Sequence, residues 1–112
     1  MTLKSSREIA SMQLAGKITR GALRAAERMV RPGVTTADID SAVEDFILSA
    51  GATPSFKNYE GFPASACVSV NGEVVHGIPS RERVLKEGDI VSVDAGAYID
   101  GFHGDAARTF PV

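Results

Sequence analysis

Apolar residues recur with a helical period through the first part of the chain. Over residues 9–29 they repeat every three or four positions, while most lysine, arginine and glutamate residues lie away from that face. Ser5 followed by Glu8 is a capping-box pattern that predicts a helix start near Ser5, and Pro32-Gly33 predicts its end. The positions expected to be buried are Ile9, Met12, Ala15, Ala22, Ala26 and Met29.

A second amphipathic helix is predicted from Thr35. Asp38 lies at the third helical position, where an acidic side chain is favourable, and Gly51 suits the position just past the helix end. A set of apolar residues follows the i, i+4, i+7, i+8 spacing of a buried stripe. The residues of this stripe are Ile39, Val43, Phe46 and Ile47.

The period changes to two in the rest of the chain. Asn71-Gly72 and Asp100-Gly101 are strong signals for two-residue turns, and β-rich stretches flank both. The predicted strand pairs are residues 66–70 with 73–76, and residues 90–98 with 102–110. Two helices followed by two hairpins predict one α+β domain, in which the helices pack on one face of an antiparallel sheet built from hairpins.

The second predicted hairpin carries two acidic residues, Asp94 and Asp105. With Asp100-Gly101 as the turn the aspartates are diagonal neighbours, and with the turn one residue earlier they face each other. Both registers place the two carboxylates on one face of the sheet, where like charges repel. A divalent cation held by the carboxylate oxygens resolves that repulsion. The alternatives are that each acid pairs with a nearby base such as Arg108, or faces water.

Residues 53–64 have no clear period and contain three aromatic residues, Phe56, Tyr59 and Phe62. Such a loop either covers the edge of a core or walls an apolar pocket. His76 ends a predicted strand, and a single histidine at that place is either structural or catalytic. The residues alone do not decide whether the loop covers a core or walls a pocket, or whether His76 is structural or catalytic.

Composition narrows the classes of function. Apolar residues make up 44% of the chain, and a net charge of −2 provides no basic surface of the kind that nucleic-acid-binding proteins carry. Cys67 is the single cysteine, which excludes an internal disulfide and a zinc site built from several cysteines. No apolar run reaches the roughly 18 residues that cross a bilayer, and the first residues do not form a signal peptide. The expected location is the cytoplasm.

Several segments together resemble the N-terminal half of type I methionine aminopeptidases, which belong to the pita-bread metallopeptidase family. The segments are Tyr59-Glu60-Gly61-Phe62-Pro63, Cys67-Val68-Ser69-Val70-Asn71, Val75-His76-Gly77-Ile78-Pro79, Gly88-Asp89-Ile90-Val91-Ser92-Val93-Asp94 and Asp100-Gly101-Phe102-His103-Gly104-Asp105. The eleven-residue spacing from Asp94 to Asp105 is also the family spacing. The resemblance runs essentially from end to end and implies half of a pita-bread fold for residues 1–112.

The resemblance implies a role for individual residues. Asp94 matches an aspartate that binds one metal ion, and Asp105 matches one that bridges two. His76 matches a catalytic histidine that contacts the substrate, while His103 is expected to have a supporting structural role. The residues implied to line a pocket for the methionine side chain are Phe56, Tyr59, Phe62 and Cys67. The implied cofactors of the complete enzyme are two divalent metal ions, which are cobalt, manganese, iron or zinc.

The implied activity is hydrolysis of the first peptide bond of a nascent protein, which releases N-terminal methionine when the second residue is small. The expected partners are N-terminal peptides of nascent proteins and the ribosome, with no DNA and no membrane, and the complete enzyme is expected to be a monomer. Two alternatives are kept. One is a related peptidase of the same fold that acts on Xaa-Pro peptides, and the other is a non-enzymatic binding module.

The family completes its metal site with a histidine and two glutamates from the second half of the fold. Residues 1–112 correspond to the N-terminal half, so the C-terminal half and its ligands are expected to be absent. Two aspartates cannot satisfy a two-ion site that takes roughly five or six ligands per ion. The 112-residue chain alone is therefore expected to bind metal weakly and to be inactive.

Overall fold

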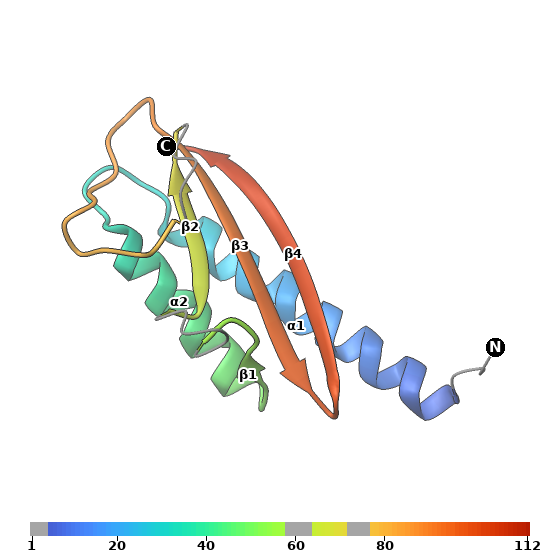
Figure 1. Cartoon of the computed structure of the whole chain (residues 1–112). Helices are drawn as coiled ribbons and strands as arrows, with labels where there is room; N and C mark the ends of the chain where they lie inside the picture. The colour runs from blue at the N-terminus through green and yellow to red at the C-terminus, as the bar shows by residue number, and fades with distance from the viewer. Residues whose placement is uncertain (1–4, 58–63, 72–76) are drawn as a thin grey trace.

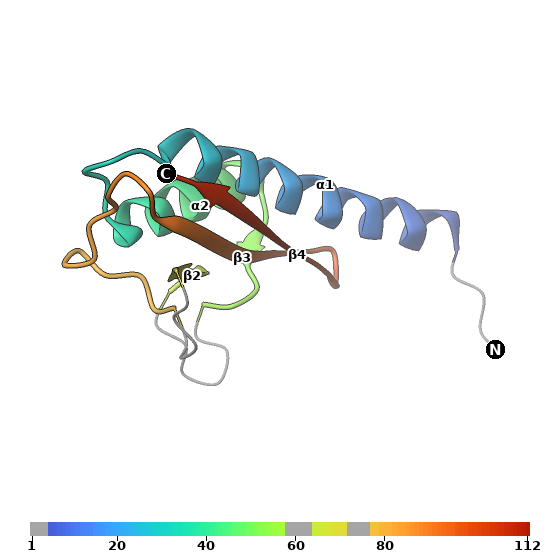
Figure 2. The ribbon, with the colours of Figure 1, turned by 90° about the horizontal axis from the view of Figure 1, so that it is seen from above.

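The computed structural model describes residues 5–57, 64–71 and 77–112. In these ranges the chain forms α1 (Ser6–Met29), α2 (Thr36–Ser49), β1 (Thr53–Pro54), β2 (Ala66–Val70), β3 (Ile90–Ile99) and β4 (Phe102–Pro111). Helix α1 packs against β3 and β4, and α2 packs against β1 and β2 (Figure 1). Figure 2 shows both helices on one face of the sheet, and none of the described helices covers the other face. This arrangement confirms the predicted α+β class.

Strand β3 is the centre of the sheet. It pairs antiparallel with β4 along its whole length, from Ile90 opposite Pro111 to Ile99 opposite Phe102. On the other edge of β3, strands β2 and β1 follow each other end to end and also run antiparallel to it (Figure 1). One long strand thus connects every other strand that the structure describes.

The turn between β3 and β4 sets the register of the hairpin. Asp100 and Gly101 have φ angles of 52° and 84°, and a two-residue type I′ turn requires positive values at both positions. Asp94 therefore lies opposite Ala107, and Asp105 lies opposite Gly96. The register with Asp100-Gly101 as the turn is confirmed, and the alternative in which the two aspartates face each other directly is wrong.

Reciprocal side-chain caps begin both helices. The Ser5 hydroxyl accepts a hydrogen bond from the Glu8 backbone N–H at 3.2 Å, and the Glu8 carboxylate accepts one from the Ser5 N–H at 3.2 Å. Thr35 and Asp38 repeat this arrangement at α2, with distances of 3.1 and 3.0 Å. Each cap satisfies backbone donors that would otherwise have no partner within the helix. Both helix starts are therefore as the sequence predicts.

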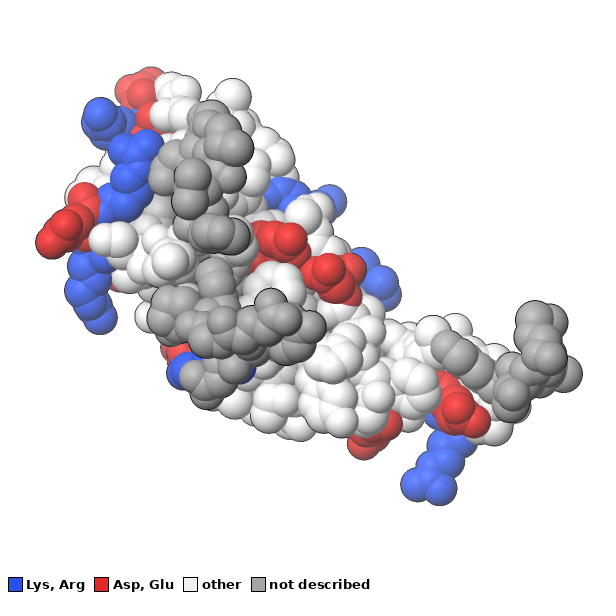
Figure 3. Space-filling model, in the orientation of Figure 1, with Lys and Arg blue, Asp and Glu red and all other residues white. Residues whose placement is uncertain are grey.

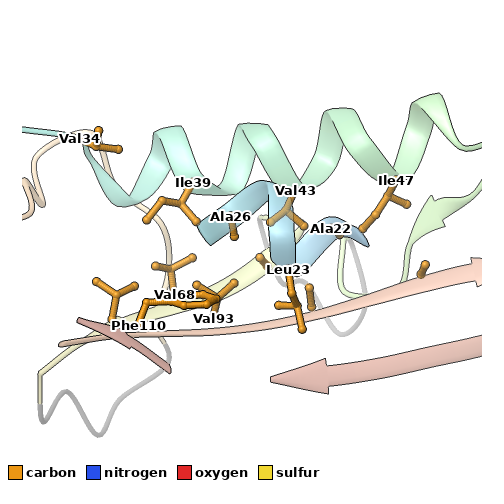
Figure 4. Packing of buried hydrophobic residues seen from close by; sticks show 14 of the residues in the cluster. Ala22, Leu23, Ala26, Val34, Ile39, Val43, Ile47, Val68, Val93 and Phe110 are labelled. Atoms are coloured by element: carbon orange, nitrogen blue, oxygen red, sulfur yellow. The ribbon is translucent and has the colours of Figure 1, made fainter. Parts of the chain in front are cut away.

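The core lies between the two helices and the sheet (Figure 4). Ile39, Val43 and Ile47 of α2 are fully buried, and Leu23 of α1 is only 1% exposed. The strands contribute Val68, Val70, Val91, Val93, Ala95 and Ala97. Removing one such large aliphatic side chain from water stabilises the fold by roughly 1.5–3 kcal/mol. This packing holds β3, and with it Asp94, against the helices.

The first turns of α1 extend past the end of the sheet (Figures 1 and 2). Ile9 and Met12 are 45% and 39% exposed, so the prediction that they are buried is wrong. The helical period identifies the apolar face but does not reveal where the sheet beneath it stops. Ala15, Ala22 and Ala26 are buried as predicted, and Met29 is partly buried against the core. Neither described helix combines the length and the hydropathy that crossing a membrane requires.

The segment predicted to be a loop begins with a short strand. Thr53 and Pro54 form β1, which pairs with Tyr98 and Ala97 of β3. Proline is rare inside a sheet but is tolerated at an edge, and for that reason the sequence pattern did not indicate a strand here. Strand β2 forms where it was predicted, but it pairs with β3. Its predicted hairpin partner, residues 73–76, lies outside the described residues.

Candidate functional site

Three neighbouring strands bring candidate residues to the face of the sheet that the helices leave open. Val93 and Ala95 of β3 point into the core, so Asp94 between them points away from the helices. Cys67 of β2 lies opposite Asp94 on one side, and Asp105 of β4 is its diagonal neighbour on the other. The prediction that both aspartates share one face is therefore confirmed.

The two aspartates interact directly. The Asp94 and Asp105 carboxyls are close enough to interact, and because two carboxylates repel each other, either a shared proton or a bound cation must offset their like charges. The pKa of Asp94 is raised to about 6, first because partial burial disfavours the carboxylate, and second because Asp105 is a hydrogen-bonding and like-charged neighbour. Figure 3 shows acidic side chains in the middle of this face, over β3 and β4.

No basic side chain among the described residues forms an ion pair with either aspartate. Arg108 lies opposite Val93, whose side chain points into the core, so Arg108 is on the other face of the sheet from the two carboxyls. The ion pair that the described ranges do contain joins Lys57 to Glu44. The alternative in which Arg108 neutralises the aspartates is therefore wrong.

A shallow pocket of about 260 Å³ lies beside the aspartates. Its lining residues are Ser55, Phe56, His103, Gly104 and Asp105. Phe56, predicted from the resemblance as a pocket residue, and Asp105, predicted as a metal ligand, thus line the same space. Their roles stay predictions, but the fold brings them together from segments about fifty residues apart in the sequence.

Ser55 and His103, which also line the pocket, were not predicted as pocket residues. The Ser55 hydroxyl lies 2.8 Å from Nδ1 of His103, and the Ser55 N–H donates to the Gly96 carbonyl at 2.9 Å. The His103 ring also contacts Tyr98, with ring centroids 4.5 Å apart. The Phe-His-Gly-Asp motif is the signal that points to His103. No signal points to Ser55, because its position depends on the pairing of β1 with β3.

Helix α1 supports the strand that carries Asp105. The Thr19 hydroxyl lies 2.8 Å from the carbonyl oxygen of Ala15 and 3.2 Å from that of Gly104, and it accepts a hydrogen bond from the Ala97 N–H at 3.2 Å. Thr19 is 1% exposed, so these bonds form away from competing water. The hydroxyl therefore joins α1, β3 and β4 next to Asp105.

The donor atoms fit part of a metal site. Carboxylate oxygens suit hard and borderline divalent cations, and Asp94 with Asp105 supplies two such groups in contact. Within residues 5–57, 64–71 and 77–112, no group of three histidine, cysteine or acidic side chains surrounds a common metal position. Tyr59, Phe62 and His76 lie outside the described residues, so their pocket and catalytic roles stay predictions.

Comparison with known proteins places these features in a family. Residues 10–112 match the model of metallopeptidase family M24. The methionine aminopeptidase of Clostridium acetobutylicum is 57% identical over 110 residues, which make up 98% of this chain and 44% of that protein. The chain thus spans less than half the length of this curated relative.

Solved structures of metallopeptidases also resemble this chain. The crystal structure of methionine aminopeptidase from Thermotoga maritima matches all of this chain with a TM-score of 0.94 and 46% identity, over 45% of its own length. The Xaa-Pro dipeptidase from Bacillus anthracis matches 98% of this chain with a TM-score of 0.81 and 30% identity, over 29% of its length. The predicted pita-bread type of fold is confirmed by these likenesses. With a family model that matches nearly all of its residues, the chain belongs to metallopeptidase family M24.

Proposed function

We propose that this chain provides part of the catalytic site of a methionine aminopeptidase, which hydrolyses the first peptide bond of a nascent protein. The observation that carries the proposal is the contact between the Asp94 and Asp105 carboxyls on an open face. Two neighbouring carboxylates repel each other unless a proton or a cation offsets their charges, and on an open face a cation can reach both, so the arrangement favours a metal-dependent reaction. The 57% identity to a methionine aminopeptidase supports the choice of substrate.

The proposed roles follow from the chemistry of the side chains. Asp94 and Asp105 would hold divalent metal ions, which when bound would supply polarisation of the carbonyl of the scissile peptide bond. Phe56 and Cys67 form an apolar, sulfur-containing wall that suits the unbranched thioether of methionine. The residues proposed to complete the wall and to contact the substrate are Tyr59, Phe62 and His76.

The alternatives have weaker support. A likeness at 30% identity to an Xaa-Pro dipeptidase is well below the 57% identity to a methionine aminopeptidase. A binding module does not need two carboxyls in contact, with one pKa raised, beside a pocket. The proposed setting is the cytoplasm, where the N-terminal peptides of nascent proteins are the substrates and the ribosome is a candidate partner. The complete enzyme is proposed to be a monomer.

A chimera tests the proposed activity. Residues 1–112 replace the matching segment of the Clostridium acetobutylicum relative, and release of methionine from Met-Ala-Ser is compared with cleavage of Xaa-Pro peptides. We expect the chimera to release methionine, and Asp105→Asn to lower its kcat/KM by more than about 100-fold, because a metal-holding carboxylate is lost. Asp100→Asn is the matched control, since it makes the same change at the exposed turn of the same hairpin. Equal activity of the two variants, or preferential cleavage of Xaa-Pro peptides, would contradict the proposal.

Metal binding by residues 1–112 alone is proposed to be weak. The chain supplies two carboxylates of a larger ligand set, so calorimetric titration with Mn²⁺ should give a Kd weaker than about 1 μM. The double variant Asp94→Asn/Asp105→Asn should abolish the remaining heat, and Asp100→Asn should leave it unchanged. Submicromolar binding of two ions by this chain would show that residues 1–112 suffice for the site.

A further inference from the structure

We propose that Ser55 and His103 form a positioning pair, which fixes the Phe56 wall of the pocket relative to Asp105. Through this pair the pocket selects the first side chain of its substrate more strictly than the wall residues alone would allow. The inference rests on the proposed function and adds two residues to it. Neither residue is proposed to touch the reacting atoms, so both act by positioning others.

The Ser55–His103 hydrogen bond connects the two sides of the pocket. Ser55 immediately precedes Phe56, and His103 lies two residues before Asp105 on β4. Because side chains alternate along a strand, His103 and Asp105 point to the same face. The 2.8 Å contact between the Ser55 hydroxyl and His103 Nδ1 therefore links the neighbour of the wall residue to the strand of the aspartate.

The residue that follows β1 lies close against β3. Strand β1 pairs through Thr53 and Pro54 only, and the next hydrogen bond is that of the Ser55 N–H to the Gly96 carbonyl at 2.9 Å. A Cβ at position 96 would lie 3.0 Å from Ser55 Cβ and 3.1 Å from its hydroxyl oxygen. The missing side chain of Gly96 thus allows Ser55 to lie close against β3, and the bond to His103 then sets the direction of its side chain.

The His103 ring is itself held in place. Tyr98 is its partner across the β3–β4 pair, and the two rings are tilted by 45° with centroids 4.5 Å apart. Ser55 is half-buried and His103 is exposed, so one neutral hydrogen bond between them contributes little to global stability. We therefore expect losing the bond to change the selectivity of the pocket more than the stability of the fold.

Selectivity is measured in the chimera described above. The ratio of kcat/KM for Met-Ala-Ser to kcat/KM for Leu-Ala-Ser does not depend on how much of the enzyme is folded, because both substrates meet the same enzyme population. We expect Ser55→Ala to lower this ratio by about threefold to tenfold, the effect of losing one neutral hydrogen bond. Ser55→Thr keeps the hydroxyl and should restore the ratio. The double variant Ser55→Ala/His103→Ala should lower the ratio by less than the two single changes added together, because the Ser55–His103 bond is lost in both single variants.

The matched control removes a similar bond elsewhere on the same face. Ser92→Ala abolishes the 3.1 Å contact between the hydroxyls of Ser92 and Thr109, which joins β3 to β4 and lies outside the pocket lining. We expect it to leave the ratio within about twofold of the parent. An unchanged ratio in Ser55→Ala, or an equal decrease in Ser92→Ala, would overturn the positioning pair.

The two proposals can fail separately. An active parent chimera whose Ser55→Ala variant keeps its selectivity overturns the pair and leaves the proposed function standing. An inactive parent chimera counts against the proposed function, and the pair is then tested by hydrogen exchange in residues 1–112. There Ser55→Ala should speed exchange of the amide at position 55 by at least about threefold, while Ser92→Ala should not. Equal exchange rates at that amide would overturn the pair.

Discussion

Replacing Gly104 with alanine is expected to lower the free energy of unfolding by about 3 kcal/mol or more. A Cβ at this position would lie 2.6 Å from the carbonyl carbon and oxygen of Ala15 and 2.8 Å from the backbone nitrogen of Gly16. These are backbone atoms of α1 and cannot rotate away, so the helix must move off β4. Urea denaturation of residues 1–112, followed by circular dichroism, measures the loss.

Gly88→Ala is the control for this substitution. Gly88 has a φ angle of +94° with no atom within 4 Å of its Cβ position, so alanine there meets backbone strain of about 1–2 kcal/mol but no collision. A loss at Gly104 no greater than that at Gly88 would show that α1 and β4 are not in close contact. A larger decrease in the free energy of unfolding for Gly104→Ala would also bear on function. Gly104 adjoins Asp105, so a shift of β4 would move the Asp105 carboxyl relative to that of Asp94.

Leu23→Ala is expected to lower the free energy of unfolding by about 2–5 kcal/mol. Leu23 of α1 is 1% exposed and points toward the sheet (Figure 4), so the smaller side chain leaves a cavity as well as losing buried apolar area. The same urea experiment measures the change, and the m-value reports whether unfolding remains a single cooperative transition.

Leu14→Ala provides the comparison within the same helix. Leu14 is 39% exposed, so truncating it removes little buried area, and we expect a loss below about 1.5 kcal/mol. Both substitutions give alanine in a helix interior and share the same change in helix propensity. Similar decreases in the free energy of unfolding for Leu14→Ala and Leu23→Ala would contradict the conclusion that Leu23 is part of the core.

Short-range sequence signals were sufficient to predict much of the fold. The caps at Ser5 and Thr35 depend on side chains three residues away, and the Asp100-Gly101 turn depends on two adjacent residues that adopt positive φ. Such interactions form within one stretch of sequence, so one sequence reveals them. The pairing of β1 with β3 and the exposure of Ile9 depend on segments far away in the chain, and no local pattern predicts them.

For the candidate site, the sequence by itself determined that Asp94 and Asp105 share a face, because strand alternation and the turn leave no other outcome. Strand alternation likewise places Arg108 on the opposite face from Asp105. Only the tertiary structure decided that Phe56 and Asp105 line one pocket and that Ser55 bonds to His103. Those contacts require β1 to lie along β3, with Ser55 close against Gly96. They arise from packing between elements, where close approach of backbones rather than residue type sets which side chains meet.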